Sequence, residues 1–247
     1  MPQIAVINES TVNSAQFSDT VMQAMLPAFD QQWNKDLQPI WGVDTATFTI
    51  VPKGQQPPSG SWWAVFLDNS DQAGALAYHD LTSEGLPLSK IFVKTLLSAN
   101  ASISVGATHE LCEMAVDPWL NSAYQDPRGT FWAGEVCDPV EDDQYGYQIG
   151  QILVTDFVTP DWFAHKYSQG VVDFKEHAQS AFQVLSGGYA QYFNPRRGWQ
   201  QVTGHTAKAA LAHAAEGSRR ERRERLHSLG RIFQVSAPRF QVSAPRR

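Results

Sequence analysis

The chain has 247 residues, of which 43% are hydrophobic and 18% are charged. No apolar run approaches the ~18 residues that a membrane span requires, so we expect a globular protein that has no contact with a membrane. Two cysteines exclude a scaffold built on disulfides. Because no basic residue precedes the short apolar stretch at the N-terminus, we expect no secretory signal and a cytoplasmic location.

The net charge of −6 is divided unevenly along the chain. Residues 1–190 contain seven basic and 22 acidic side chains, a net charge of −15, whereas residues 191–247 contain twelve and three, a net charge of +9. This division predicts an acidic domain over 1–190 and a basic, partly helical or disordered arm over 191–247.

Strand and helix patterns alternate in the first half of the chain, which predicts a mixed α/β or α+β domain. Apolar residues spaced three or four apart over 13–37 predict a long N-terminal helix that buries one face. Residues 91–97 fit either a strand or the start of a short helix. The strands expected from alternation and composition are 4–7, 47–51, 62–67, which we place centrally, and 74–81.

The pattern over 104–116 predicts the clearest helix of the chain. Ser102 or Ser104 can cap its start, and Pro118 ends it because the residue before a proline avoids the helical region. Farther along, 145–158 predicts a hairpin around Gly150, and 171–185 predicts another helix. Two glycines at 187–188 mark the expected end of the compact domain.

The helix over 104–116 carries a His-Glu-x-x-Glu motif at its centre. His109 and Glu113 are four residues apart, so both can face one metal ion from the same side of the helix. Glu110 occupies the position at which zinc peptidases place the carboxylate that takes a proton from the attacking water. Asp117 lies two turns beyond His109. The alternative is that these acids point into water and that Asp117 makes a turn with Pro118.

A second acidic cluster follows at 135–143. This run contains no basic residue, and two carboxylate clusters repel each other unless a cation joins them. In zinc peptidases whose third ligand is a downstream glutamate, that ligand follows the motif helix by a few tens of residues. We therefore expect Glu135 as the third ligand, with Asp138 as its competitor. The alternative is a solvated turn before the hairpin.

The run HELCEMAVDP, followed by Trp132 and then by EVCD, resembles the pattern of zincin-like HExxE proteins. These occur in bacteria, among phage-encoded proteins and in the plant exordium-like, phosphate-induced family. The likeness covers roughly residues 100–160 and implies a zincin-like α/β fold with a metal site, for zinc or for a harder ion. Cys137 departs from the pattern, and Glu113 stands where authentic HExxH peptidases have a second histidine. The matching residues are His109, Glu110, Glu113, Asp117, Glu135 and Asp138.

Other residues carry weaker signals. His79 and His165 lie beside aromatic residues, and we interpret both as structural. Cys112 lies among acidic residues, so we expect a thiol of low reactivity. The sequence has neither a G-x-S-x-G elbow nor a phosphate-binding glycine motif.

Two hypotheses for function follow. The first is a metal-dependent hydrolase acting on peptides or proteins, in which His109, Glu113 and Glu135 hold zinc and Glu110 is the general base. The second is a structural or docking protein, for example a virion or assembly component. Its arginine-rich segment 219–225, with the tandem heptapeptide FQVSAPR after it, would bind nucleic acid or an acidic protein. Alternatively, the arm folds back onto the acidic domain.

Overall fold

The computed structural model describes residues 1–72, 74–164, 170–204 and 233–234. A five-stranded mixed sheet occupies its N-terminal part. Four parallel strands stand next to one another, and an antiparallel strand, β4, forms one edge. This confirms the expected mixed α/β class and the central place of β3. The order is β2 (Thr47–Val51), β1 (Gln3–Asn8), β3 (Trp62–Leu67), β5 (Pro87–Phe92) and β4 (Ala77–Leu81).

The expected N-terminal helix is present but starts later, with Ser18 as its cap. It spans 23 residues in three parts, α1 (Asp19–Gln31), a π-helical segment (Gln32–Leu37) and α2 (Gln38–Trp41). In the π-helical segment the Gln38 amide bonds to the Trp33 carbonyl, five residues back. Gly42, with φ +68°, ends the helix. Buried Met22, Met25 and Phe29 form the face that joins the main core.

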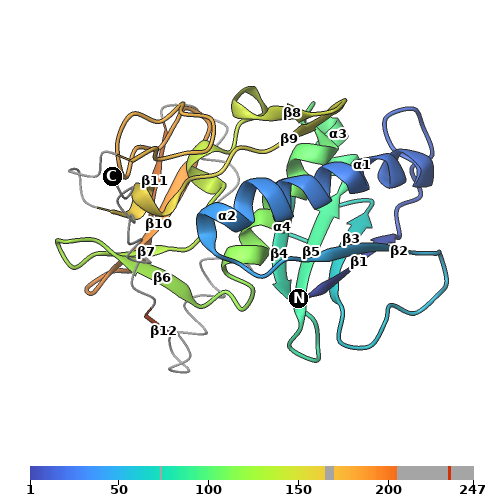
Figure 1. The fold of residues 1–247 in the computed structure, drawn as a ribbon, viewed down its shortest axis with the longest axis horizontal. Helices are drawn as coiled ribbons and strands as arrows, with labels where there is room; N and C mark the ends of the chain where they lie inside the picture. Colours follow the sequence, from blue (N-terminus) through green and yellow to red (C-terminus); the bar gives the residue numbers. More distant parts are fainter. Residues whose placement is uncertain (73, 165–169, 205–232, 235–247) are drawn as a thin grey trace, which may run out of the picture.

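Two helices follow the first sheet, α3 (Val93–Ser98) and α4 (Ile103–Val116). The ambiguous stretch 91–97 is thus the end of a strand and the start of a helix. The hydroxyl of Ser102 caps α4 by accepting a hydrogen bond from the Val105 amide, 3.4 Å long. Almost all of α4 is buried, and it lies between the first sheet and the C-terminal strands (Figure 1).

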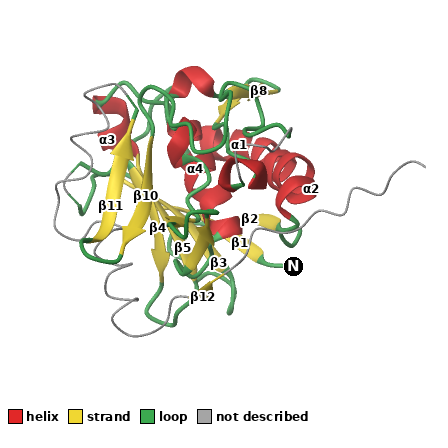
Figure 2. Cartoon of the chain, turned by 90° about the vertical axis from the view of Figure 1, so that its left-hand side faces the viewer, coloured by secondary structure: helices red, strands yellow, loops and turns green. Residues whose placement is uncertain are grey.

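A second five-stranded sheet forms the other end of the molecule (Figures 1 and 2). The order of its strands is β11 (Gly198–Thr203), β10 (Tyr189–Asn194), β7 (Phe131–Ala133), β6 (Ser122–Gln125) and β12 (Phe233–Gln234).

The hairpin expected around Gly150 is confirmed as a separate two-stranded sheet of β8 (Tyr147–Ile149) and β9 (Ile152–Val154).

The prediction of a helix over 171–185 is wrong. Asp173 instead forms a β-bridge with Val158, and its carboxylate accepts hydrogen bonds from the amides of His177 and Ala178. Phe182 has a positive φ of 60° and packs its ring against Trp162. Side-chain hydrogen bonds and aromatic packing therefore hold an irregular segment where the apolar spacing alone favours a helix.

The second sheet packs tightly against the segment that follows β7. A side chain at Gly188 would place its Cβ 2.6 Å from the carbonyl oxygens of Asp138 and Pro139. The Leu185 amide donates a hydrogen bond of 2.9 Å to the same Pro139 carbonyl. The start of β10 therefore holds the backbone around Asp138 in place.

Strand β10 crosses residue 190, the boundary that the charge division predicts between domain and arm, and β11 lies beyond it in the same sheet. The arginine-rich segment and most of the tandem heptapeptide lie outside the described residues, apart from the short strand β12, which pairs with β6 in parallel. Within the described part of the chain, no helix is long and apolar enough to cross a membrane.

The cap of α4 can be tested directly. Ser102→Ala removes the hydroxyl that accepts from Val105, so we expect a loss of about 1 kcal/mol of unfolding free energy. In a chain of this size that loss lowers Tm by about 2–4 °C. Ser98→Ala is the matched control, because the Ser98 hydroxyl donates a hydrogen bond to the Lys94 carbonyl within its own helix. Equal Tm values for the two variants would contradict the capping role.

Candidate metal centre

Helix α4 carries three of the expected site residues into the interior of the protein. His109, Glu110 and Glu113 are 5%, 2% and 0% exposed. The Nε2 atom of His109 lies 3.3 Å from Oε1 of Glu113, one helical turn away. The same nitrogen is 4.0 Å from Oε1 of Glu110. The imidazole and both carboxylates therefore meet on one side of the helix.

The segment after β7 adds Asp138, which begins a short 3-10 helix over Asp138–Val140. Its Oδ1 atom is 3.2 Å from Nε2 of His109. The Cys137 amide next to it donates a hydrogen bond of 3.3 Å to Oε1 of Glu113. His109, Glu113 and Asp138 thus form a buried group whose ligand atoms all lie within 4.8 Å of one another.

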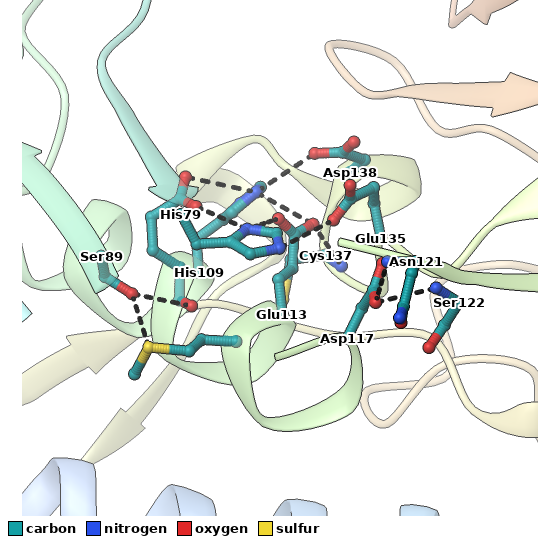
Figure 3. Close-up of polar contacts among 12 residues, drawn as sticks. His79, Ser89, His109, Glu113, Asp117, Asn121, Ser122, Glu135, Cys137 and Asp138 are labelled. Carbon is teal, nitrogen blue, oxygen red and sulfur yellow. Dashed lines mark hydrogen bonds and ion pairs between the residues drawn. The ribbon is translucent and has the colours of Figure 1, made fainter. Parts of the chain in front are cut away.

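His79, on the edge strand β4, reaches the same cluster from the other side (Figure 3). Its Nδ1 atom is 3.3 Å from Oε2 of Glu110 and 3.5 Å from Oε2 of Glu113. Its Nε2 atom is 3.7 Å from Oε2 of Glu135. The interpretation of His79 as merely structural is therefore incomplete, since it forms a second potential metal group with Glu110 and Glu113.

The other two expected ligands have different surroundings. Glu135 is buried and faces His79, and it belongs to neither of these metal-competent groups. Asp117 is also buried, and its Oδ1 atom accepts hydrogen bonds of 2.8 and 2.9 Å from the amides of Asn121 and Ser122. These bonds turn the chain from the end of α4 into β6.

The carboxylates create a strongly negative environment around both imidazoles. Burial by itself lowers the pKa of His79, but Glu135, Glu110 and Glu113 together raise it to about 10. Burial also opposes the protonation of His109, whereas Glu113 and Asp138 raise its pKa well above the usual value. The site therefore favours positive charge, which either protons or a bound cation can provide.

The donor set fits a divalent transition metal. Imidazole and carboxylate groups are the usual ligands of zinc, and three protein ligands leave coordination positions open for water or substrate. A set rich in oxygen also suits harder ions such as Mn²⁺. The buried His, Glu and Asp groups can thus bind a metal ion, and the donor types alone do not select one.

Cys112 and Cys137 are both buried free thiols beside this cluster. Burial and the neighbouring Cys112 raise the pKa of the Cys137 thiol well above its usual value. A thiol held neutral in this way is a poor nucleophile.

Comparison with known proteins finds no matching family model, no matching curated protein and no matching solved structure. The resemblance to zincin-like HExxE proteins therefore stays a prediction from the motif residues.

A third group, Asp156, Asp173 and His177, lies near the β8–β9 hairpin. Both carboxylates are fully buried, and Nδ1 of His177 is 3.0 Å from Oδ2 of Asp156. Burial, followed by the neighbouring Asp173, raises the pKa of Asp156 to about 9. The Asp156 carboxyl group therefore keeps its proton at neutral pH.

The proton on Asp156 makes the stability of the folded protein depend on pH. Because the pKa of Asp156 is raised on folding from 3.8 to about 9, its proton stabilises the folded state at low pH. The contribution is complete below about pH 4 and is lost as the pH rises through about 9. In Asp156→Asn, whose amide is neutral at every pH, we expect Tm to fall less between pH 5 and pH 9 than in the unsubstituted protein. Parallel pH profiles in thermal melts would contradict the raised pKa of Asp156.

Proposed function

We propose that the chain is a metal-dependent hydrolase of the zinc peptidase type, with His109, Glu113 and Asp138 as ligands. The observation that carries the proposal is the buried convergence of these three side chains beside Glu110. Asp138 is a better third ligand than Glu135, because its oxygen is 3.2 Å from the ring nitrogen of His109. The mixed sheet with an antiparallel edge strand beside the motif helix also supports a zincin-like fold.

In this proposal Glu110 is the general base. Its carboxylate lies between the two imidazoles and is only 2% exposed, so it can receive a proton without competition from bulk water. A divalent cation bound by the three ligands would polarise a substrate carbonyl and acidify a water molecule. The Cys137 amide, hydrogen-bonded to Glu113, fixes the orientation of that ligand.

A peptide is the substrate class that the fold favours. Strand β4 is at the edge of its sheet and carries His79 into the centre, so an extended peptide that pairs with β4 would pass close to Glu110. The net charge of −15 over residues 1–190 favours basic or neutral peptides over acidic ones.

Two substitutions distinguish the proposed role of Glu110 as general base from that of His109 as metal ligand. Glu110→Gln removes the base, so we expect hydrolysis of a peptide library to fall at least ~100-fold while the ion held by His109 stays bound. His109→Ala removes a ligand, so we expect both the ion and the activity to be lost. Glu84→Gln, a change on an exposed loop, is the matched control and should leave both unchanged. Full activity of Glu110→Gln would exclude its role as base.

The second candidate function is docking through the basic arm, with or without catalysis. Five of the seven residues over 219–225 are arginine, and residues 191–247 carry a net charge of +9. Such a segment releases counterions when it meets a polyanion. Nucleic acid or an acidic protein is the partner that this charge favours.

Salt dependence tests the arm in the full chain. Replacing the five arginines of 219–225 by glutamine should weaken binding to a nucleic-acid duplex and reduce the slope of log K against log[salt]. Arg196→Gln with Arg197→Gln, in the exposed turn between β10 and β11, is the control for unspecific loss of charge. If both variants bind with the salt dependence of the unsubstituted protein, the segment does not bind polyanions.

A further inference from the structure

The two buried groups of the metal centre share one residue, Glu113. Its Oε1 atom faces Nε2 of His109 at 3.3 Å, whereas its Oε2 atom faces Nδ1 of His79 at 3.5 Å. We infer that the centre binds two divalent cations, with the Glu113 carboxylate bridging them. The inference rests on the proposed function, which supplies the first ion in site A (His109, Glu113, Asp138). It adds site B (His79, Glu110, Glu113).

The separations in site B match those of ligands around one ion. Nδ1 of His79 is 3.3 Å from Oε2 of Glu110 and 3.5 Å from Oε2 of Glu113. Ligands about 2.0–2.2 Å from a tetrahedral ion lie roughly 3.3–3.6 Å from one another. Both separations from His79 therefore match those around one ion, and the ligand atoms of all three residues lie within 4.8 Å of one another.

The orientation of His79 is a second, independent observation. Its Nδ1 atom faces site B, while its Nε2 atom lies 3.7 Å from a carboxylate oxygen of Glu135. A histidine that ligates a metal generally directs its other ring nitrogen at a carboxylate or carbonyl, which fixes the tautomer and the ring plane. This gives Glu135 a role as the outer partner of His79 instead of a ligand.

Charge and spacing agree with two ions. The cluster contains four buried carboxylates, and two divalent cations match their formal charge. A carboxylate that binds through both oxygens holds two metal ions about 3.5–4 Å apart, the spacing of two-metal hydrolases. The carboxylates are those of Glu110, Glu113, Glu135 and Asp138.

Occupation of site B has a consequence for the chemistry. Once Oε2 of Glu110 ligates a cation, the carboxylate loses basicity and no longer accepts a proton efficiently. The chain should therefore be active with site A alone filled and inhibited by excess metal. Site B is then a regulatory site, in which the metal concentration controls the general base.

The test counts Zn²⁺ per chain by equilibrium dialysis and mass spectrometry. All proteins carry His177→Ala, which removes the imidazole of the third group and any ion held there. We expect two ions in this background, one after His79→Gln and one after His109→Ala. Circular dichroism verifies that each variant is folded.

A second measurement needs no substitution in the centre. Titration of the same protein with Mn²⁺ should give the spectrum of an isolated ion in electron paramagnetic resonance at one equivalent. The second equivalent should broaden and weaken this signal, because a shared carboxylate couples the two spins. Additive signals without coupling would contradict a bridge through Glu113.

The outcomes separate the two proposals. One ion that His79→Gln leaves in place would overturn site B and leave the proposed function intact. One ion lost equally in His79→Gln and His109→Ala would mean a single site shared by both histidines, which also overturns the inference. The absence of any bound ion would overturn the proposed function itself.

Discussion

The burial of carboxylates on α4 is the constraint around which the rest of the structure is arranged. A helix that carries Glu110 and Glu113 into the interior is costly unless positive charge and hydrogen-bond donors surround them. The protein meets this requirement from two directions, with His79 on the edge strand β4 and the Cys137 amide in the segment after β7. The two sheets therefore supply complementary halves of one polar centre.

The second sheet contributes to this centre through its backbone. Gly188 leaves no space for a side chain against the carbonyls of Asp138 and Pro139, so the start of β10 and the segment carrying Asp138 form one close-packed unit. Asp117 acts in a comparable way at the end of α4, where its carboxylate binds the amides that lead into β6. Asp117, which the sequence motif suggests as a ligand, thus directs the chain from the end of α4 into the second sheet.

Local patterns in the sequence predict the local part of this arrangement. The four-residue spacing of His109 and Glu113 predicts their common face, because helical periodicity alone determines it. The choice between Glu135 and Asp138 depends on how a loop turns, and no periodicity encodes that. The sequence leads to a structural interpretation of His79, because its proximity to α4 depends on the antiparallel pairing of β4 with β5, which no local pattern encodes. The prediction of a helix over 171–185 is wrong, because the Asp173 carboxylate accepts hydrogen bonds from backbone amides of that segment.

The π-helical segment over Gln32–Leu37 determines the directions in which the side chains of α2 point relative to those of α1. Gln32, its first residue, donates to the Thr155 carbonyl, and Trp41, in α2 beyond it, donates to the Val158 carbonyl. The Thr155 amide in turn donates to the hydroxyl of Thr108, the neighbour of His109. Deleting one residue within the segment would restore an ordinary helix and rotate Trp41 by about 100°. The wide turn therefore lets one helix make both of these contacts on the side of α4 that carries Thr108.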